Sequence, residues 1–185
     1  GGAGIVAKHL KSLGANVTIT SIIGDDKLGK YVIKDLRKHN IKTNLIVDKN
    51  RPTTLKERFW ADNYKLIQVD LVDNNVPSEK IINQIKQKII KTKSKAIVFS
   101  DFRHGVFNKE SIKLFSKCIN KSTIKIADSQ VSNRWGNISE FENFDLILPN
   151  EKEARFSLGD QDSGVRQLGT KLYKETKPKY LILKL

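Results

Sequence analysis

Methionine is absent from all 185 residues, and cysteine occurs once. The lone Cys118 has no second cysteine for an internal disulfide, which excludes a disulfide-stapled framework and suits a reducing cytosol. Nothing around Cys118 supports a catalytic thiol, so we expect a buried small apolar residue there. Without methionine, Gly1 is not a natural start, and the closing apolar run 180–185 is followed by no turn or tail. We therefore expect an internal piece of a longer protein.

Long apolar runs are also missing. No stretch approaches the length that spans a membrane, and no basic and then apolar leader opens the chain. The hydrophobic fraction of 38% and the charged fraction of 29% describe an ordinary soluble protein, long enough for one domain or most of one. The expectation is a cytoplasmic protein that has no membrane partner.

Arginine is scarce in a strongly basic chain. The net charge is +14, yet only seven of the 34 basic residues are arginines, and the lysines are spread along every segment. Nucleic-acid sites usually rely on Arg for bidentate contacts with phosphates and bases. We therefore expect no nucleic-acid partner, but a solvated lysine-rich surface that attracts anionic metabolites.

The first part of the chain alternates helical and strand-like patterns. A helix is predicted from about residue 5 to 13, a strand over 17–23 and a second helix from about 27 to 39. Short alternating runs follow at 43–47, 53–60 and 65–69, and the last two flank a plausible hairpin turn at 61–64. These runs, over about 43–70, are interpreted as a small inserted antiparallel sheet.

From Ser78 onward strands and helices alternate regularly. Helices are predicted over 78–90 and 109–120 and from about 151 and 163, and strands over 96–99 and 123–127 and at 146 and 180, with an irregular stretch through Trp135. This alternation predicts an α/β fold with a mostly parallel sheet covered on both faces. Ligands bind at the carboxyl ends of strands in such sheets, and the loop after each of four strands carries an acid or an amide.

One of these loops holds Asn150 and Glu153 at the start of a helix. At a spacing of three residues they share one face of the first turn, where an amide and a carboxylate suit a hydrated magnesium ion and the phosphates that it carries. The same pair would equally form a capping box, with Glu153 at the third helical position. The residues alone leave both interpretations open.

The opening glycines have several interpretations as well. The segment 2–7 fits G-x-G-x-x-A, and Asp25 follows a strand a little over twenty residues later, as in nicotinamide-dependent oxidoreductases of the dinucleotide-binding fold. Alternatively, Gly1 and Gly2 let backbone amides approach the hydroxyls of a bound sugar. Glycines for close helix packing are the third interpretation.

Several motifs in order resemble the ribokinase-like (PfkB) carbohydrate kinases over the whole chain. They are Gly-Gly-Ala opening a helix, Ser12-Leu13-Gly14-Ala15, Gly24-Asp25-Asp26-x-x-Gly29, and Asn150-x-x-Glu153, which matches that family's magnesium and phosphate motif. The resemblance implies a ribokinase-like three-layer sandwich with the inserted sheet as its β lid, and a partial kinase domain over 1–185. It also implies use of ATP and Mg²⁺, and a candidate homodimer through the lid.

Other motifs are similar to the kinase part of bifunctional heptose-7-phosphate kinase/adenylyltransferases. They are Pro52-Thr53-Thr54-x-Lys56, Gln68-x-Asp70, Ser100-Asp101-Phe102-x-x-Gly105 and Leu148-Pro149-Asn150. This similarity implies ATP-dependent phosphorylation of a sugar or sugar phosphate, with a heptose 7-phosphate as substrate. The chain departs from the family at Ile5, where many relatives carry Asn, and at Arg103-His104. A non-catalytic sugar- or nucleotide-binding protein that kept the fold is a further alternative.

The resemblance assigns roles to individual residues. Gly1 and Gly2 would contact the sugar, and Asn150 and Glu153 would organise magnesium. The family's catalytic Asp lies in a Gly-Ala-Gly-Asp segment that would follow residue 185, so no catalytic residue is expected in this chain, and the isolated chain should be inactive.

Charge and turn chemistry suggest three more candidates. Lys56 and Arg103 are candidates for the substrate's own phosphate, although the lysine-rich surface favours solvated charges at both positions. Asp101 either hydrogen-bonds substrate hydroxyls or caps its loop.

Overall fold

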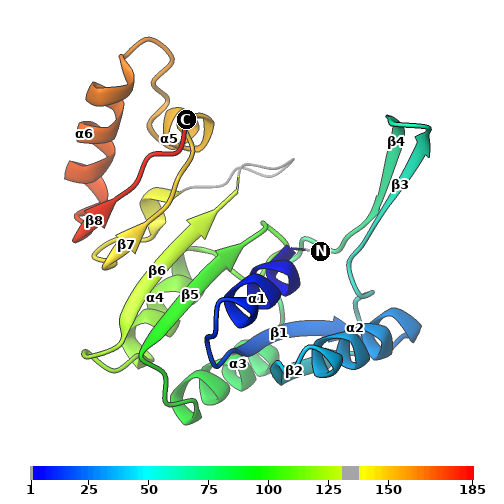
Figure 1. The fold of residues 1–185 in the computed structure, drawn as a ribbon. Helices are drawn as coiled ribbons and strands as arrows, with labels where there is room; N and C mark the ends of the chain where they lie inside the picture. The colour runs from blue at the N-terminus through cyan, green and yellow to red at the C-terminus, as the bar shows by residue number, and fades with distance from the viewer. Residues whose placement is uncertain (1, 131–137) are drawn as a thin grey trace. The chain divides into compact units, whose positions relative to one another are not determined.

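The computed structural model describes residues 2–130 and 138–185, so part of the expected irregular stretch through Trp135 lies outside the described residues. Helices alternate with strands that are mostly parallel, and the predicted α/β class is therefore confirmed (Figure 1). The chain divides into two compact units, residues 1–88 and residues 89–185, which are described in turn.

The first unit begins with a small aliphatic core. Its elements are α1 (Gly2–Ser12), β1 (Thr18–Gly24), α2 (Lys27–Lys38) and β2 (Lys42–Asp48), and α3 (Glu79–Lys91) begins in this unit and ends just past its boundary. Ala7, Leu36 and Ile41 are buried together, and the partly buried residues packed against them are Val17, Ile19, Val32 and Leu45. The α2 helix begins where the Asp26 side chain accepts a hydrogen bond from the backbone N–H of Gly29.

An antiparallel hairpin is inserted after β2. Its strands β3 (Leu55–Ala61) and β4 (Tyr64–Leu71) are joined by a two-residue turn, as the sequence predicts, and run side by side as a long ribbon (Figure 1). The expectation that residues 43–47 belong to this antiparallel sheet is wrong. They lie in β2, which pairs in parallel with β1 from Thr18↔Lys42 to Gly24↔Asp48, because the intervening α2 returns the chain in the same direction.

The second unit is built on a four-stranded parallel sheet in the order β5-β6-β7-β8. Its elements are β5 (Ala96–Asp101), α4 (Lys109–Cys118), β6 (Ile124–Ser129), the short 3₁₀ helix η1 (Ile138–Glu140), β7 (Leu146–Ile147), α5 (Glu151–Leu158), α6 (Val165–Thr176) and β8 (Tyr180–Leu181). In Figure 1, α4 lies behind β5 and β6. The strands continue further than predicted, because the ladder pairs Ser100 with Asp128 and Asp101 with Ser129, residues that the sequence suggested were loops.

Phenylalanines fill the core of this second unit. Phe99, Phe115, Phe141 and Phe144 are at most 3% exposed, and the ring centroids of Phe141 and Phe144 lie 5.4 Å apart in an edge-to-face arrangement. Leu168 and Leu172 of α6 are fully buried as well. This rigid core supports the carboxyl ends of four parallel strands.

Two further expectations concern the burial of Cys118 and membrane-spanning helices. Cys118 is half-buried, not buried, and its thiol donates a hydrogen bond to the carbonyl oxygen of Leu114 at 3.1 Å, within the last turns of α4. Among the helices of the described residues, none combines the length and the apolar character that crossing a bilayer requires.

Candidate functional site

Polar side chains gather at the carboxyl ends of the parallel strands in the second unit, and they divide between two faces of the sheet. Asp101 stands opposite Ser129 in the ladder, and Ser100 stands opposite Asp128. Because successive residues of a strand point to opposite faces, Asp128 and Ser129 point away from each other. Two separate clusters therefore form at this edge of the sheet.

The first cluster is centred on Asp101, whose side chain is only 1% exposed. Its Oδ1 accepts a hydrogen bond from the backbone N–H of Arg103 at 2.7 Å, and its Oδ2 accepts from the Arg103 guanidinium and from the Ser129 hydroxyl, both at 2.9 Å. Three donors thus stabilise the buried carboxylate. Sequence reasoning missed Ser129, although its position two residues after the buried Ala127 indicates an inward-facing side chain.

Arg103 is fixed by this arrangement. Its backbone has φ +60°, in the left-handed region, and its side chain is 12% exposed. A solvated surface charge, the interpretation that the lysine-rich surface favours, is therefore wrong for Arg103. Asp101 takes the loop-capping role that was one of its two expected roles, since it binds the backbone two residues further on.

Glu140 is a third charged residue near Asp101 and Arg103, and no motif or spacing in the sequence singled it out. Burial raises the pKa of the Glu140 carboxyl, the positive charge of Arg103 opposes that shift, and the negative charge of Asp101 adds to it. Its Oε2 atom is buried and has no hydrogen-bond partner among the described residues. Arg103 therefore lies within electrostatic reach of two carboxylates.

The Asn150–Glu153 pair forms the capping box. The Asn150 side-chain oxygen accepts from the Glu153 backbone N–H at 2.8 Å, and Glu153 Oε2 accepts from the Asn150 backbone N–H at 2.7 Å. Glu153 is 4% exposed. The capping interpretation thus describes the pair's geometry, while the magnesium role that the sequence suggests stays a prediction.

The second cluster joins this cap to β6 and to Lys184, which follows β8. Asn150 forms a parallel bridge with Lys184, and the Lys184 ammonium lies 2.9 Å from Asp128 Oδ1. No group of three or more His, Cys, Asp or Glu suited to a metal ion occurs within residues 2–130 and 138–185. Magnesium usually keeps several waters and takes only one or two carboxylates, so the donor types of the predicted pair, an amide and a carboxylate, suit such an ion without an all-protein cage.

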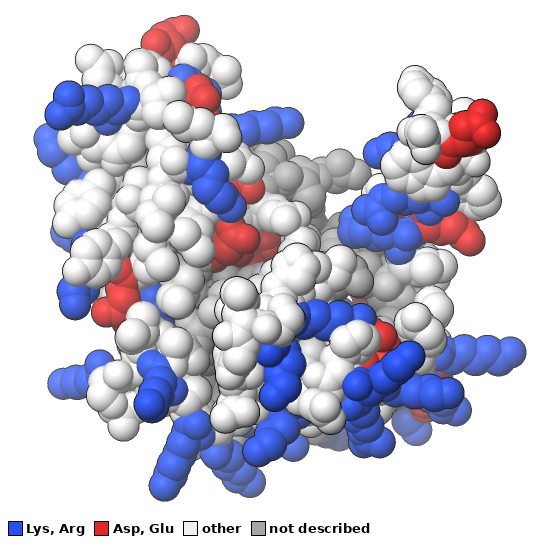
Figure 2. Space-filling model, viewed as in Figure 1, with Lys and Arg blue, Asp and Glu red and all other residues white. Residues whose placement is uncertain are grey.

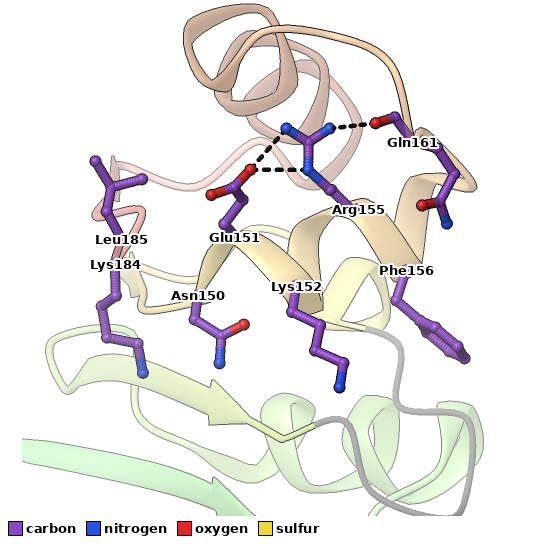
Figure 3. A pocket seen from close by; sticks show the side chains of 8 residues that line it. All are labelled: Asn150, Glu151, Lys152, Arg155, Phe156, Gln161, Lys184 and Leu185. Carbon is purple, nitrogen blue, oxygen red and sulfur yellow. Dashed lines mark hydrogen bonds and ion pairs between the residues drawn. The ribbon is translucent and has the colours of Figure 1, made fainter.

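A pocket of about 500 Å³ opens at this second cluster. Figure 3 shows the Asn150, Lys152 and Lys184 side chains pointing to the same side of it, and Arg155 turned the other way. Arg155 contacts Glu151 Oε1 at 2.7 Å and donates to three carbonyl oxygens of the loop that follows α5, Asp160, Gln161 and Ser163. The pocket therefore has one cationic side and one side fixed by hydrogen bonds.

The remaining predicted residues lie in the first unit. Gly1 lies outside the described residues, and Gly2 has φ 49°, a conformation that favours glycine. Lys56 on β3 is paired with Asp70 on β4 at 2.8 Å, and this contact is the main reason why the pKa of Asp70 is lowered. Lys56 is thus an exposed member of an ion pair on the polar face of the hairpin.

Basic side chains are widely distributed on the surface. On the face drawn in Figure 2, lysine and arginine side chains lie over the hairpin and over both units, with apolar and uncharged surface between them. This distribution matches the spread of lysines along the sequence.

Comparison with known proteins gives consistent matches. A model described as "pfkB family carbohydrate kinase" matches residues 1–185. Bifunctional protein HldE of Campylobacter concisus is 31% identical over 156 residues, covering 83% of this chain and 32% of that protein. The HldE of a Nitratiruptor species is 29% identical over 192 residues, covering 100% of this chain and 39% of that protein. The chain thus spans about a third of these curated relatives.

Solved structures share the fold at lower identity. Phosphofructokinase-2 from Escherichia coli, in complex with fructose-6-phosphate, superimposes with a TM-score of 0.77 at 21% identity, over 100% of this chain and 62% of that one. Ribokinase from Giardia lamblia gives a TM-score of 0.75 at 15% identity, over 98% and 61%. The expected ribokinase-like fold is therefore confirmed.

Proposed function

The chain belongs to the pfkB family of carbohydrate kinases, and we propose that the full-length protein transfers a phosphoryl group from ATP to a hydroxyl of a sugar or sugar phosphate. The observation that carries this proposal is the pair of clusters at one edge of the β5–β8 sheet. One holds an arginine against a buried aspartate, and the other holds an asparagine, a glutamate and a lysine at the start of a helix. Phosphoryl transfer needs mainly positioning and charge stabilisation, which both clusters can supply.

A heptose 7-phosphate is the substrate that we favour. The motifs around Thr53, Gln68, Asp101 and Asn150 support it, because they resemble those of heptose-7-phosphate kinases. Arg103 adds a physical reason, since a guanidinium that is already oriented by Asp101 is suited to bind a substrate phosphate through two donors. Asp101 then acts by holding Arg103, and Lys56 stays a second candidate for the same phosphate.

Magnesium and ATP belong to the second cluster in this proposal. Asn150 and Glu153 would hold the ion through water, and the ion would neutralise charge on the phosphates. Lys184 and Lys152 contribute positive charge on one side of the same pocket. The α5 N-terminus adds backbone N–H groups and the positive end of its dipole. The general base would be the Asp that the family resemblance assigns to a segment beyond residue 185.

The sequence left two alternative functions open, and the family match bears on only one of them. The family match along the whole chain argues against a nicotinamide-dependent oxidoreductase built on the opening glycines. A non-catalytic sugar- or nucleotide-binding protein shares the family fold, so it is separated from the kinase only by experiment. The single cysteine supports a cytoplasmic location, because no disulfide framework is available.

We also propose that two copies associate through the β3–β4 hairpin. One face of the hairpin carries Phe59, Ile67, Val69 and Leu71, each at least 47% exposed, while the other carries the Lys56–Asp70 ion pair. A two-stranded ribbon with an apolar face is marginal alone in water. A second copy of the same hairpin presents a matching apolar face and would cover it.

The proposed activity is tested by incubating the full-length protein with magnesium-ATP and a panel of acceptors: heptose 7-phosphates, fructose 6-phosphate and unphosphorylated sugars. ADP release and the mass of the product are measured. We expect transfer to a phosphorylated sugar, with heptose 7-phosphate preferred. Transfer only to unphosphorylated sugars would contradict the substrate assignment, and sugar binding without any transfer would support the binding-protein alternative.

A pair of arginine variants tests the substrate-phosphate contact. Arg103→Met should raise KM for the sugar phosphate at least about tenfold, the effect of losing a charged hydrogen bond, and leave KM for ATP unchanged. Arg37→Met, on the exposed face of α2, is the matched control and should change neither constant. Equal effects of the two substitutions would remove Arg103 from the site.

A further inference from the structure

Residues 49–54, the first leg of the hairpin, connect β2 to β3, and one side chain in this segment is buried. Thr53 is 6% exposed, whereas the adjacent Thr54 is exposed. A buried threonine between an exposed turn and an exposed strand needs a partner for its hydroxyl. The contacts of Thr53 are therefore informative about how the hairpin is attached.

Thr53 is bonded on both sides to the loop that follows β1. Its Oγ1 atom accepts a hydrogen bond from the backbone N–H of Gly24 at 2.9 Å, and its own backbone N–H donates to Asp26 Oδ2 at 2.8 Å. The other carboxylate oxygen of Asp26 accepts from the Gly29 backbone N–H at 2.7 Å and caps α2. The hairpin leg, the β1 loop and the start of α2 are thus joined through two residues.

The two glycines of this region allow the close approach. A Cβ atom at Gly24 would lie 2.6 Å from the Arg51 carbonyl oxygen and 2.7 Å from the Thr53 backbone nitrogen. A Cβ atom at Gly29 would lie 2.5 Å from the Gly24 carbonyl oxygen. Any side chain at Gly24 would push the hairpin leg away from the loop.

Arg51 connects this leg to the second leg, residues 72–78. Its guanidinium donates to the carbonyl oxygen of Asn75 at 2.8 Å and lies 3.8 Å from Asp73, while its Nε atom lies 3.5 Å from Asp48 at the end of β2. The side chain is 9% exposed. Both legs are therefore held together at the base of the hairpin.

We propose that Thr53 is a positioning residue, which fixes the base of the hairpin to the loop after β1, with Arg51 holding the second leg to the first. Motion of the hairpin then occurs above Thr53, at the exposed residues from Thr54 onward. This inference goes beyond the proposed activity and does not depend on it.

The test measures the hairpin's position directly by pulsed electron spin resonance on the full-length protein. Spin labels are attached through Asn63→Cys, in the hairpin turn, and Lys38→Cys, at the exposed end of α2. Cys118 and any cysteine outside residues 1–185 are replaced by serine, so that only the two introduced cysteines carry labels. Both sites belong to the first unit. The width of the label–label distance distribution reports how firmly the hairpin is held.

Thr53→Val should at least double this width, because the methyl group cannot accept the Gly24 hydrogen bond. Thr53→Ser, which keeps the hydroxyl, should restore the narrow distribution, and Thr54→Val is the matched control that should leave it narrow. Arg51→Met should broaden it less than Thr53→Val. An unchanged width in Thr53→Val, or equal broadening in Thr54→Val, would overturn the proposal.

A second variant covers the case in which Thr53→Val fails to fold. Gly24→Ala keeps every hydrogen-bonding group and changes only the space between the loop and the leg. It should displace the mean label–label distance in a protein that still unfolds cooperatively on heating. A cooperative Gly24→Ala variant with the parent mean distance and width would likewise overturn the assignment of Thr53 as the attachment point.

Discussion

The β3–β4 hairpin and the β5–β6 ladder are both paired strands rich in β-branched and aromatic residues, yet their surroundings differ completely. In β5 and β6, Phe99, Asp101, Ala127 and Ser129 are at most 3% exposed. In β4 every residue is exposed, and in β3 every residue after Leu55. Alternate residues share a face in both pairs of strands. Among the described residues, however, α4 lies against the β5–β6 pair (Figure 1), whereas the hairpin stays exposed on both faces. Rigidity of the polar groups at the strand ends therefore follows from packing and not from strand pairing.

The largest expected effect comes from removing part of the aromatic core. Phe141→Ala should lower the free energy of unfolding by about 3–5 kcal/mol, because a fully buried ring that contacts Phe99, Phe107 and Phe144 is replaced by a cavity. The hairpin substitution Trp60→Ala, at a side chain that is 57% exposed on the opposite face from Phe59, should cost less than about 1 kcal/mol. Urea denaturation followed by circular dichroism measures both. Comparable losses in the two variants would show that the hairpin is packed as firmly as the core.

The next effect concerns the buried carboxylate. Asp101→Asn should destabilise the protein by about 2 kcal/mol, because the amide loses the charge that Arg103 faces and presents only one oxygen to three donors. Asp128→Asn is the matched control on the opposite face of the sheet, where the partner Lys184 is 46% exposed, and should cost less than about 1 kcal/mol. Thermal unfolding compares the two. A smaller loss for Asp101→Asn than for Asp128→Asn would contradict the assigned difference in burial.

The third effect tests what covers the apolar face of the hairpin. Ile67→Lys should weaken association of two copies at least about tenfold, because a charge would be buried in the proposed interface. Gln68→Lys places the same charge on the polar face and should leave association unchanged. Light scattering over a concentration series measures the molar mass of the full-length protein. A monomeric parent protein, or equal weakening by both substitutions, would remove the hairpin from the interface.

Most of the fold could be predicted from the sequence because its signals are local. The helical period after Asp26 and Ser78, the turn between Ala61 and Tyr64 and the alternation of helices and strands all act within short windows. The pairing of β2 could not be predicted in this way. A short alternating run carries no information on the direction of its neighbour, and residues 43–47 were therefore grouped with the hairpin, although they pair with β1.

The candidate site could likewise be predicted only in part, because only some of its contacts join residues that are close in the sequence. Asn150 and Glu153 are three residues apart, so their capping box was among the interpretations of the sequence. Thr53 with Gly24, Ser129 with Asp101 and Lys184 with Asp128 are pairs separated by 28 to 56 residues. Such pairs exist only after the strands have taken their order in the sheet. From the lysine-rich composition, Arg103 was expected to be a solvated surface charge. The structure instead pairs it with the buried carboxylate of Asp101.

The smallest expected effect belongs to Glu140, beside the first cluster. Because burial raises the pKa of this carboxyl above its ordinary value of 4.5, the folded state binds the proton more tightly than the unfolded state. The contribution to stability is therefore present below that value and is lost as the pH rises through the higher pKa of the folded state. Glu140→Gln removes this loss, so its stability relative to the parent should increase from pH 4 to pH 7 by less than about 1 kcal/mol, because the residue is partly exposed and Arg103 opposes the shift. Glu142→Gln, two residues away and exposed, should show no such trend in urea denaturation at each pH. A fall in the relative stability of Glu140→Gln over this range would mean that attraction to Arg103 outweighs burial, and would make Glu140 a second anchor of Arg103 beside Asp101.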